Sequence, residues 1–144
     1  MKSIAIIGAG ISGLYLANLF KDNEDYQVTI YEKKSSIELN DGYGIQLSTN
    51  SIKQLNKIGF NTLGNKERFH PEKIDFYTII REKKICDLNI SDFNTADCKY
   101  TTLKRSKLVE FLKNSLNNNT IKYGHSIDKI EKNYDQIHLT FNKN

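Results

Sequence analysis

The sequence has few cysteines and no long hydrophobic run, and these two absences argue against a metal site and against a membrane span. Its two cysteines, Cys86 and Cys98, have neither another cysteine nor a histidine at a metal-ligand spacing. We therefore expect no metal site and two reduced thiols, as in a cytoplasmic protein. No stretch approaches the roughly 20 apolar residues of a membrane span. The apolar run after Met1 is broken too early by glycines to be a signal peptide.

The charged residues lack the clustering that nucleic-acid binding requires. Lys and Arg number 21 against 17 Asp and Glu, which gives a formal net charge of +4. The lysines are spread along the chain beside acidic residues, so we expect no nucleic-acid partner. A mildly positive balance does suit a small anionic ligand. The 144 residues contain no linker rich in Pro or Ser, and we expect one globular domain, 1–144.

The most informative feature that is present is a glycine-rich turn. The apolar residues 3–7 lead into Gly-Ala-Gly-Ile-Ser-Gly at 8–13, and a helical pattern of apolar residues fills 11–21. A second β-like run, 27–31, ends on the acid Glu32. Strand, glycine turn, helix, strand and acid in this order form the dinucleotide-binding fingerprint. The alternative is a glycine-rich turn before an ordinary helix, with a surface glutamate after the next strand.

Each residue type in this pattern has a physical reason to be there. Gly8 allows a tight turn off the strand, Gly10 lets a pyrophosphate lie against bare backbone, and Gly13 lets the helix pack close to the strand. The start of the helix presents free N–H groups and the positive end of its dipole to phosphates. The acid accepts hydrogen bonds from ribose hydroxyls. The predicted cofactor-binding residues are thus Gly8, Gly10, Ile11, Ser12, Gly13 and Glu32.

The rest of the chain mixes short β-like runs with two amphipathic helices. The pattern predicts an α/β fold with a βαβ opening, a parallel sheet and an antiparallel hairpin insertion. Residues 91–102 show no regular pattern. The expected strands are 44–47, 74–80, 84–90, 121–123, 126–131 and 136–141, and the expected helices are 50–58, capped by Ser48 or Thr49, and 104–116.

The order of these motifs resembles the FAD-binding half of the flavoprotein aromatic hydroxylases, the para-hydroxybenzoate hydroxylase-like monooxygenases. Their opening is similar to residues 6–14, and their acid followed by a basic residue is similar to Glu32-Lys33. A Gly-Ile-x-Leu-x-x-Asn stretch that leads to a Leu-Gly helix end is similar to residues 44–60. Their Arg-x-x-Leu-x-x-x-Leu helix start is similar to residues 105–112.

The resemblance implies FAD as the cofactor of a Rossmann-like domain, with NAD(P)H as co-substrate and a small aromatic molecule as the substrate of the complete enzyme. It implies that Arg105 contacts the flavin diphosphate and ribityl chain, where a guanidinium grips two phosphate oxygens at once. It also implies that Gln46 approaches the flavin and Lys33 the adenosine ribose. The alternative for each of the three is a solvated surface residue. Because the flavin carries the reaction, we expect no catalytic side chains.

One family signature, a strand that ends in Asp-Gly, is absent, and so is the substrate domain. We therefore expect an incomplete fold, completed by missing segments or by a complementing polypeptide, with the third strand of the parallel sheet among the missing parts. Three functions remain open. They are the FAD-binding portion of a flavin-dependent monooxygenase, another FAD or NAD(P) oxidoreductase of the same superfamily, and a non-catalytic remnant or interaction module.

Overall fold

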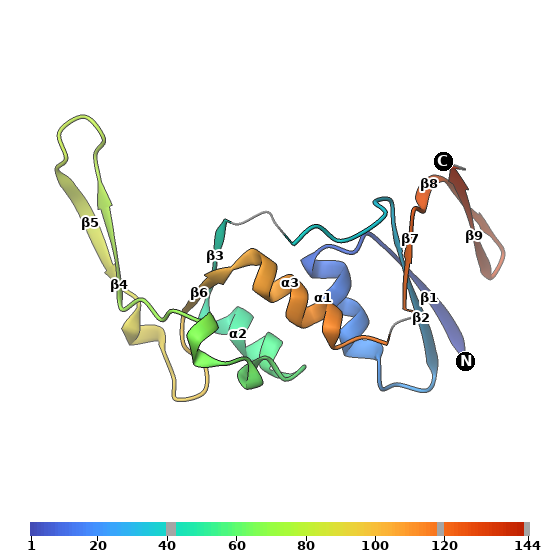
Figure 1. The fold of residues 1–144 in the computed structure, drawn as a ribbon, viewed down its shortest axis with the longest axis horizontal. Helices are drawn as coiled ribbons and strands as arrows, with labels where there is room; N and C mark the ends of the chain where they lie inside the picture. The colour runs from blue at the N-terminus through green and yellow to red at the C-terminus, as the bar shows by residue number, and fades with distance from the viewer. Residues whose placement is uncertain (40–42, 118–119, 143–144) are drawn as a thin grey trace. The chain divides into compact units, whose positions relative to one another are not determined.

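The computed structural model describes residues 1–39, 43–117 and 120–142 (Figure 1). The chain divides into two compact units. Unit 1 consists of Met1–Asp41 and Leu108–Asn144, and unit 2 consists of Gly42–Lys107. The division falls within helix α3 (Arg105–Asn114), so this helix begins in unit 2 and continues in unit 1.

Unit 1 is built on a parallel sheet of three strands in the order β1-β2-β7 (Figure 1). Strand β1 (Lys2–Ile7) is joined by helix α1 (Ile11–Phe20) to β2 (Tyr26–Glu32), with Ile6 beside Ile30 in register. The predicted βαβ opening and α/β fold class are confirmed. Strand β7 (Ile121–Tyr123) pairs with the end of β2, so the expectation that the third parallel strand is missing was wrong.

The core of unit 1 lies between the sheet and the helices α1 and α3. Alternate residues of β1 and β2 face this core, as the period of a strand requires. The polar side chain of Asn18 is buried in this core, 3% exposed, and donates through Nδ2 to the carbonyl oxygens of Leu14 at 2.9 Å and Leu112 at 2.8 Å. It therefore ties α1 to the last turns of α3. The buried apolar residues of this core are Ile6, Leu14, Ala17, Ile30, Leu108, Val109 and Leu112.

An antiparallel hairpin follows the sheet, as the alternating pattern predicts. Strand β8 (Ser126–Asn133) pairs with β9 (Gln136–Asn142), with a register shift between Ile127 and Lys129. The base of this hairpin contacts the sheet, because the Phe141 ring, opposite Ile127, lies 4.6 Å from the Tyr31 ring, centroid to centroid. That aromatic contact joins the hairpin to strand β2.

Unit 2 contains a short antiparallel sheet of β3 (Gly44–Leu47) and β6 (Thr101–Lys104), together with helix α2 (Thr49–Asn56). Ser48 holds the N-cap position of α2, but its hydroxyl makes no cap hydrogen bond. Strand β6 corrects the prediction of irregular structure up to residue 102, because Thr101 and Thr102 already pair with β3. Buried residues of this unit include Ile52, Leu55, Phe60, Ile90 and Leu103, and three short 3-10 turns lie at Phe60–Thr62, Asn65–Glu67 and Ser91–Phe93.

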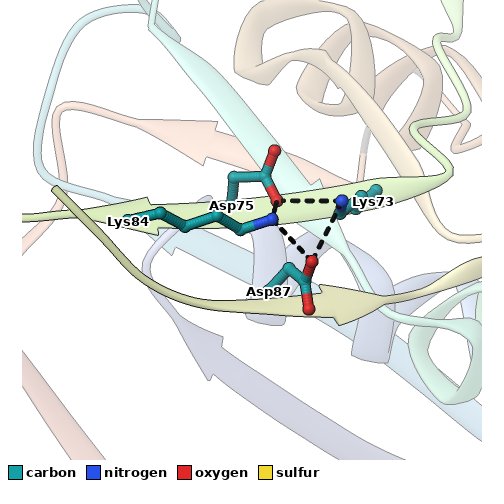
Figure 2. A network of polar contacts seen from close by, with 4 residues as sticks. All are labelled: Lys73, Asp75, Lys84 and Asp87. Atoms are coloured by element: carbon teal, nitrogen blue, oxygen red, sulfur yellow. Dashed lines mark hydrogen bonds and ion pairs between the residues drawn. The ribbon is translucent and has the colours of Figure 1, made fainter.

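A second hairpin, which belongs to unit 2, carries four alternating charges on one face (Figure 2). Strands β4 (Lys73–Tyr77) and β5 (Lys84–Asn89) confirm the predicted pair and place Asp75 beside Asp87. Lys84 Nζ lies 2.9 Å from the Asp75 carboxylate and 2.6 Å from that of Asp87, and Lys73 Nζ lies 3.4 Å and 3.0 Å from the same two groups. The two lysines therefore offset the repulsion between the two acids.

This network shifts the titration of its members. The hydrogen bonds from Lys84 and Lys73 lower the pKa of Asp87 to about 2, and the bond from Lys84 lowers the pKa of Asp75. The bonds to Asp87 and Asp75 raise the pKa of Lys84. All four charges are solvent-accessible, so salt screens the network.

We expect the Asp87 carboxyl to titrate at about pH 2 in low salt. An unfolded aspartate titrates at about 3.9, so the network's contribution to stability is fully present above that pH and is lost as the pH falls through about 2. A carboxyl carbon NMR titration measures this. Lys84→Met should return the Asp87 pKa towards its ordinary value, whereas Lys83→Met, in the neighbouring turn, should not. An equal effect of both substitutions would contradict the network.

Asn18→Ala should lower the free energy of unfolding by about 1–3 kcal/mol, because the substitution removes both hydrogen bonds and leaves the Leu112 carbonyl without this donor. Chemical denaturation measures the change. Asn114→Ala, at an exposed position of α3, is the matched control and should change stability by less than about 0.5 kcal/mol. Equal stabilities of the two variants would exclude Asn18 as the link between α1 and α3.

Candidate nucleotide-binding site

The glycine turn lies between the carboxyl end of β1 and the first residue of α1. Gly8 has a φ of +97°, a conformation that favours glycine, and its amide donates to the Tyr31 carbonyl oxygen at 2.8 Å. At Gly13 an added Cβ would lie 2.1 Å from the Gly8 carbonyl oxygen. At Gly10 an added Cβ would meet no atom within 4 Å. The turn is therefore closed on the side that faces the strand and open beyond Gly10.

The start of α1 points unused donors towards this opening. The first hydrogen bond within the helix runs from the Leu14 amide to the Gly10 carbonyl oxygen at 2.9 Å. The amides of Ile11, Ser12 and Gly13 therefore have no acceptor within the helix. No acidic residue lies in the first turn, and Gly10 has no side chain that could cap it. The helix dipole adds a partial positive charge at this end.

The carboxylate of Glu32, at the end of β2, lies against the turn. Its Oε2 accepts a hydrogen bond from the Ala9 amide at 2.7 Å, and its Oε1 accepts one from the Lys34 amide at 3.0 Å. Burial by itself would raise the pKa of this carboxyl. The hydrogen bonds from the Lys34 and Ala9 amides, with the charge of Lys33, outweigh burial and lower the pKa below its ordinary value. The group is therefore an anion at neutral pH.

Strand β7 completes the surroundings of Glu32. Tyr123 lies beside Glu32 in the register of β2 and β7, and its pKa is raised by burial and by the charge of that glutamate. The His125 amide donates to the Glu32 carbonyl oxygen at 2.9 Å, and the Gly124 amide donates to the Lys34 carbonyl oxygen at 3.0 Å. The segment after β7 thus holds the backbone around the acid in place.

Two further predicted residues belong to unit 2. Gln46, on β3, accepts a hydrogen bond through Oε1 from the Tyr100 hydroxyl at 2.9 Å. Arg105, the first residue of α3, has its guanidinium 5.8 Å from the centroid of the Tyr43 ring, and its amide donates to the Tyr43 carbonyl oxygen at 3.1 Å. Pairing of β3 with β6 places Gly44 opposite Lys104, next to Arg105. This small sheet therefore brings the predicted Gln46 and Arg105 segments together.

The structure groups the predicted site residues into two sets. Unit 1 holds the turn with Glu32 and the exposed Lys33, and unit 2 holds Gln46 with Arg105. Sequence reasoning missed the Ala9 amide, which is the donor to Glu32, and the two tyrosines that contact the unit 2 residues. Of the two tyrosines, Tyr43 alone could have been noticed in the sequence, because it directly precedes the segment 44–60 on which the family resemblance partly rests.

Two other classes of site find no support in the described residues. Within residues 1–39, 43–117 and 120–142, no three or more His, Cys, Asp or Glu side chains gather as a group that could hold a metal ion. In the same residues no helix is long and apolar enough to cross a membrane.

Comparisons with known proteins show what the chain as a whole is similar to. A sequence model of the family described as "NAD(P)-binding Rossmann-like domain" matches residues 6–54. The chain is 25% identical over 145 residues to a 6-hydroxynicotinate 3-monooxygenase from Pseudomonas fluorescens. This match covers 96% of this chain and 36% of that protein. The chain thus spans about a third of the length of this curated relative.

Solved structures give the same result. A putative FAD-containing monooxygenase from Photorhabdus luminescens is 26% identical with a TM-score of 0.74, and the match covers 98% of this chain and 35% of that one. HpxO from Klebsiella pneumoniae, complexed with FAD and uric acid, is 16% identical with a TM-score of 0.78, over 97% of this chain and 35% of that one. The predicted resemblance to flavoprotein aromatic hydroxylases is confirmed, and so is the Rossmann-like fold.

Gly13→Ala should destabilise unit 1 by about 3 kcal/mol or more, because its Cβ would collide with the backbone oxygen of Gly8. Chemical denaturation measures this. Gly64→Ala is the matched control: Gly64 has an ordinary φ of −58° and open space around its Cα, so it should change stability by less than about 1 kcal/mol. A Gly13→Ala variant as stable as the control would disprove the close approach of α1 to the turn.

Proposed function

We propose that this chain is the FAD-binding portion of a flavin-dependent monooxygenase, which uses NAD(P)H and O₂ to hydroxylate an aromatic or related small molecule. The observation that carries the proposal is the position of the Glu32 carboxylate, whose Oε2 lies 2.7 Å from the amide nitrogen of Ala9 in the glycine turn. Acid and turn thus meet at the carboxyl ends of two adjacent parallel strands, where open α/β sheets bind nucleotides.

The residues present fit the adenosine diphosphate part of FAD. The open space beyond Gly10 and the free amides at the start of α1 suit a diphosphate, and the remaining lone pairs of the ionised Glu32 suit ribose hydroxyls. Lys33, which follows the acid, adds a positive charge near the ribose. When bound, FAD supplies the redox chemistry that the side chains of this chain lack.

The residues of unit 2 are assigned to the flavin end of the cofactor. Among the described residues Arg105 forms no ion pair, so its guanidinium remains available for the diphosphate. Gln46 keeps its amide group as a donor, because its oxygen accepts from Tyr100. We propose that the two residues hold the diphosphate and approach the flavin, respectively.

The names of the related proteins support the substrate class. They include a 6-hydroxynicotinate 3-monooxygenase, a 2,6-dihydroxypyridine-3-hydroxylase and a protein complexed with uric acid, which all name small aromatic or heteroaromatic rings. We therefore propose a compound of this kind as the substrate of the whole enzyme.

We further propose that a complementing polypeptide segment completes the fold. Among the described strands β1 pairs only with β2, so its second edge is open to a strand of that segment.

Two other functions are tested in the same experiments. The match to an NAD(P)-binding domain family favours, as the second candidate, another FAD or NAD(P) oxidoreductase. Bound FAD absorbs at about 450 nm and should raise the melting temperature of the chain, because a ligand of the native state stabilises it. NAD(P)H oxidation that an aromatic compound stimulates, measured on the completed enzyme, separates the monooxygenase from other oxidoreductases. No stabilisation by FAD, NADH or NADPH would leave the non-catalytic module.

Gly10→Val should abolish stabilisation by FAD while leaving the melting temperature of the free protein nearly unchanged. The added side chain enters space that is empty in the protein and would lie where a phosphate must approach the backbone. Thermal unfolding with and without FAD measures both effects. Gly64→Val, at another glycine with open surroundings, should keep the full FAD shift. An FAD shift in Gly10→Val equal to that of the wild type would place the diphosphate elsewhere.

A further inference from the structure

We propose that Glu32 is a positioning residue that holds the glycine turn in its binding conformation before any nucleotide arrives. This role is separate from the ribose contact and rests on the proposed function only where ligand affinity is concerned. The bond from the Ala9 amide to Oε2, at 2.7 Å, joins residues 23 positions apart in sequence. It therefore fixes the turn after β1 to the end of β2 in the protein without ligand.

Both carboxylate oxygens of Glu32 accept a hydrogen bond from the backbone, and the two bonds, from the Ala9 and Lys34 amides, together form what we term the brace. While Oε2 accepts from the turn, Oε1 accepts from the Lys34 amide at 3.0 Å, so the side chain is held at both ends. The backbone adds a parallel bond from the Gly8 amide to the Tyr31 carbonyl oxygen at 2.8 Å. Ala9 is 4% exposed, which shields its bond from water. A carboxylate has about four lone-pair positions, so the backbone bonds do not exhaust its capacity to accept from a ligand.

The brace has a direct consequence for phosphate binding. Because the Ala9 amide is already engaged, the amides that remain for a diphosphate lie beyond it, from Gly10 to Gly13 at the start of α1. A turn that is ordered in advance loses less conformational entropy when it binds. Glu32 therefore strengthens binding of a phosphate group even when the ligand carries no ribose. A residue that acted only on ribose would have no such effect.

Glutamine does not reproduce this arrangement. One end of its amide accepts a hydrogen bond, but the other end is an NH₂ donor, which would face the N–H of either Ala9 or Lys34. Protonation of Glu32 likewise places a donor, an O–H group, on one of the two oxygens that accept from the backbone. Burial raises the pKa of this carboxyl, but the Lys34, Ala9 and Lys33 amides and the Lys33 charge lower it by more, so the carboxyl is ionised at neutral pH; Tyr123 lies beside it, and the charge of Glu32 raises the pKa of that tyrosine.

The test compares Glu32→Gln with Glu38→Gln in the 144-residue chain. Glu38 contacts the Lys34 ammonium at 3.2 Å and makes no contact with the turn among the described residues, so its variant removes the same charge nearby and leaves the brace. The first readout, without ligand, is hydrogen exchange of the Ala9 amide by NMR. The second is the affinity for two probes, inorganic pyrophosphate and ADP, by calorimetry.

We expect Glu32→Gln to speed Ala9 exchange about tenfold and to weaken both probes, pyrophosphate by about tenfold, while Glu38→Gln changes neither quantity by more than about twofold. Loss of a negative charge by itself would strengthen pyrophosphate binding. Tighter or unchanged pyrophosphate binding in Glu32→Gln, with only ADP weakened, would overturn the proposal and leave a ribose contact alone. Unchanged Ala9 exchange would also overturn it.

The wild-type protein supplies an independent measurement in case Glu32→Gln does not fold. Its Ala9 amide proton shift should follow the titration of Glu32 as the pH falls below the ordinary glutamate range. An amide shift that stays flat through this range would overturn the brace. If the wild type binds none of pyrophosphate, ADP or FAD, the proposed function fails, whereas the exchange and shift measurements still decide whether Glu32 fixes the turn.

Discussion

The site depends on the contact between the start of α1 and the glycine turn. Only hydrogen occupies the Gly13 position where a Cβ would lie 2.1 Å from the Gly8 carbonyl oxygen, so the helix can come this close to β1. That approach aims the first amides of α1 at the space beyond Gly10. The left-handed φ of Gly8 then turns the chain sharply enough for β2 to bring its final acid alongside. The absence of a side chain at Gly8 and at Gly13 thus determines where the polar groups of the site lie.

The parts of this arrangement that a sequence reveals are those that local chemistry determines. A glycine turn between a β-run and an apolar helix restricts the backbone strongly, and the acid ends the next β-run. The βαβ opening and both hairpins could therefore be predicted. Strand β6 could not, because only Thr101–Lys104 are extended before α3 begins, and their pairing partner β3 lies more than fifty residues earlier in the sequence. A prediction from local pattern contains no information on such pairing.

The contacts within the candidate site were equally beyond local pattern. The bond from Ala9 to Glu32 depends on the register of β1 and β2, which places Ile7 beside Tyr31 and so brings the turn level with the acid. An alanine shows no sign of a polar role, because the donor is its backbone. The residue pattern predicts β7 as a strand, but its place as the third parallel strand follows only from its pairing with β2. Long-range register therefore accounts for most of what sequence reasoning missed.

Helix capping shows why no single feature of the turn is sufficient. A capping side chain or an acid in the first turn stabilises a helix by about 1 kcal/mol, and α1 has neither. Helix α2 also has no acid in its first turn, and Ser48 at its N-cap makes no cap hydrogen bond, so an uncapped start is not by itself a sign of a ligand. Among the helices that the structure describes, α1 alone combines its free amides with a residue that leaves open space and with an ionised carboxylate fixed beside it. Under the proposed function, a diphosphate joined to a ribose would fit this arrangement, with its anion at the amides and its hydroxyls at the acid.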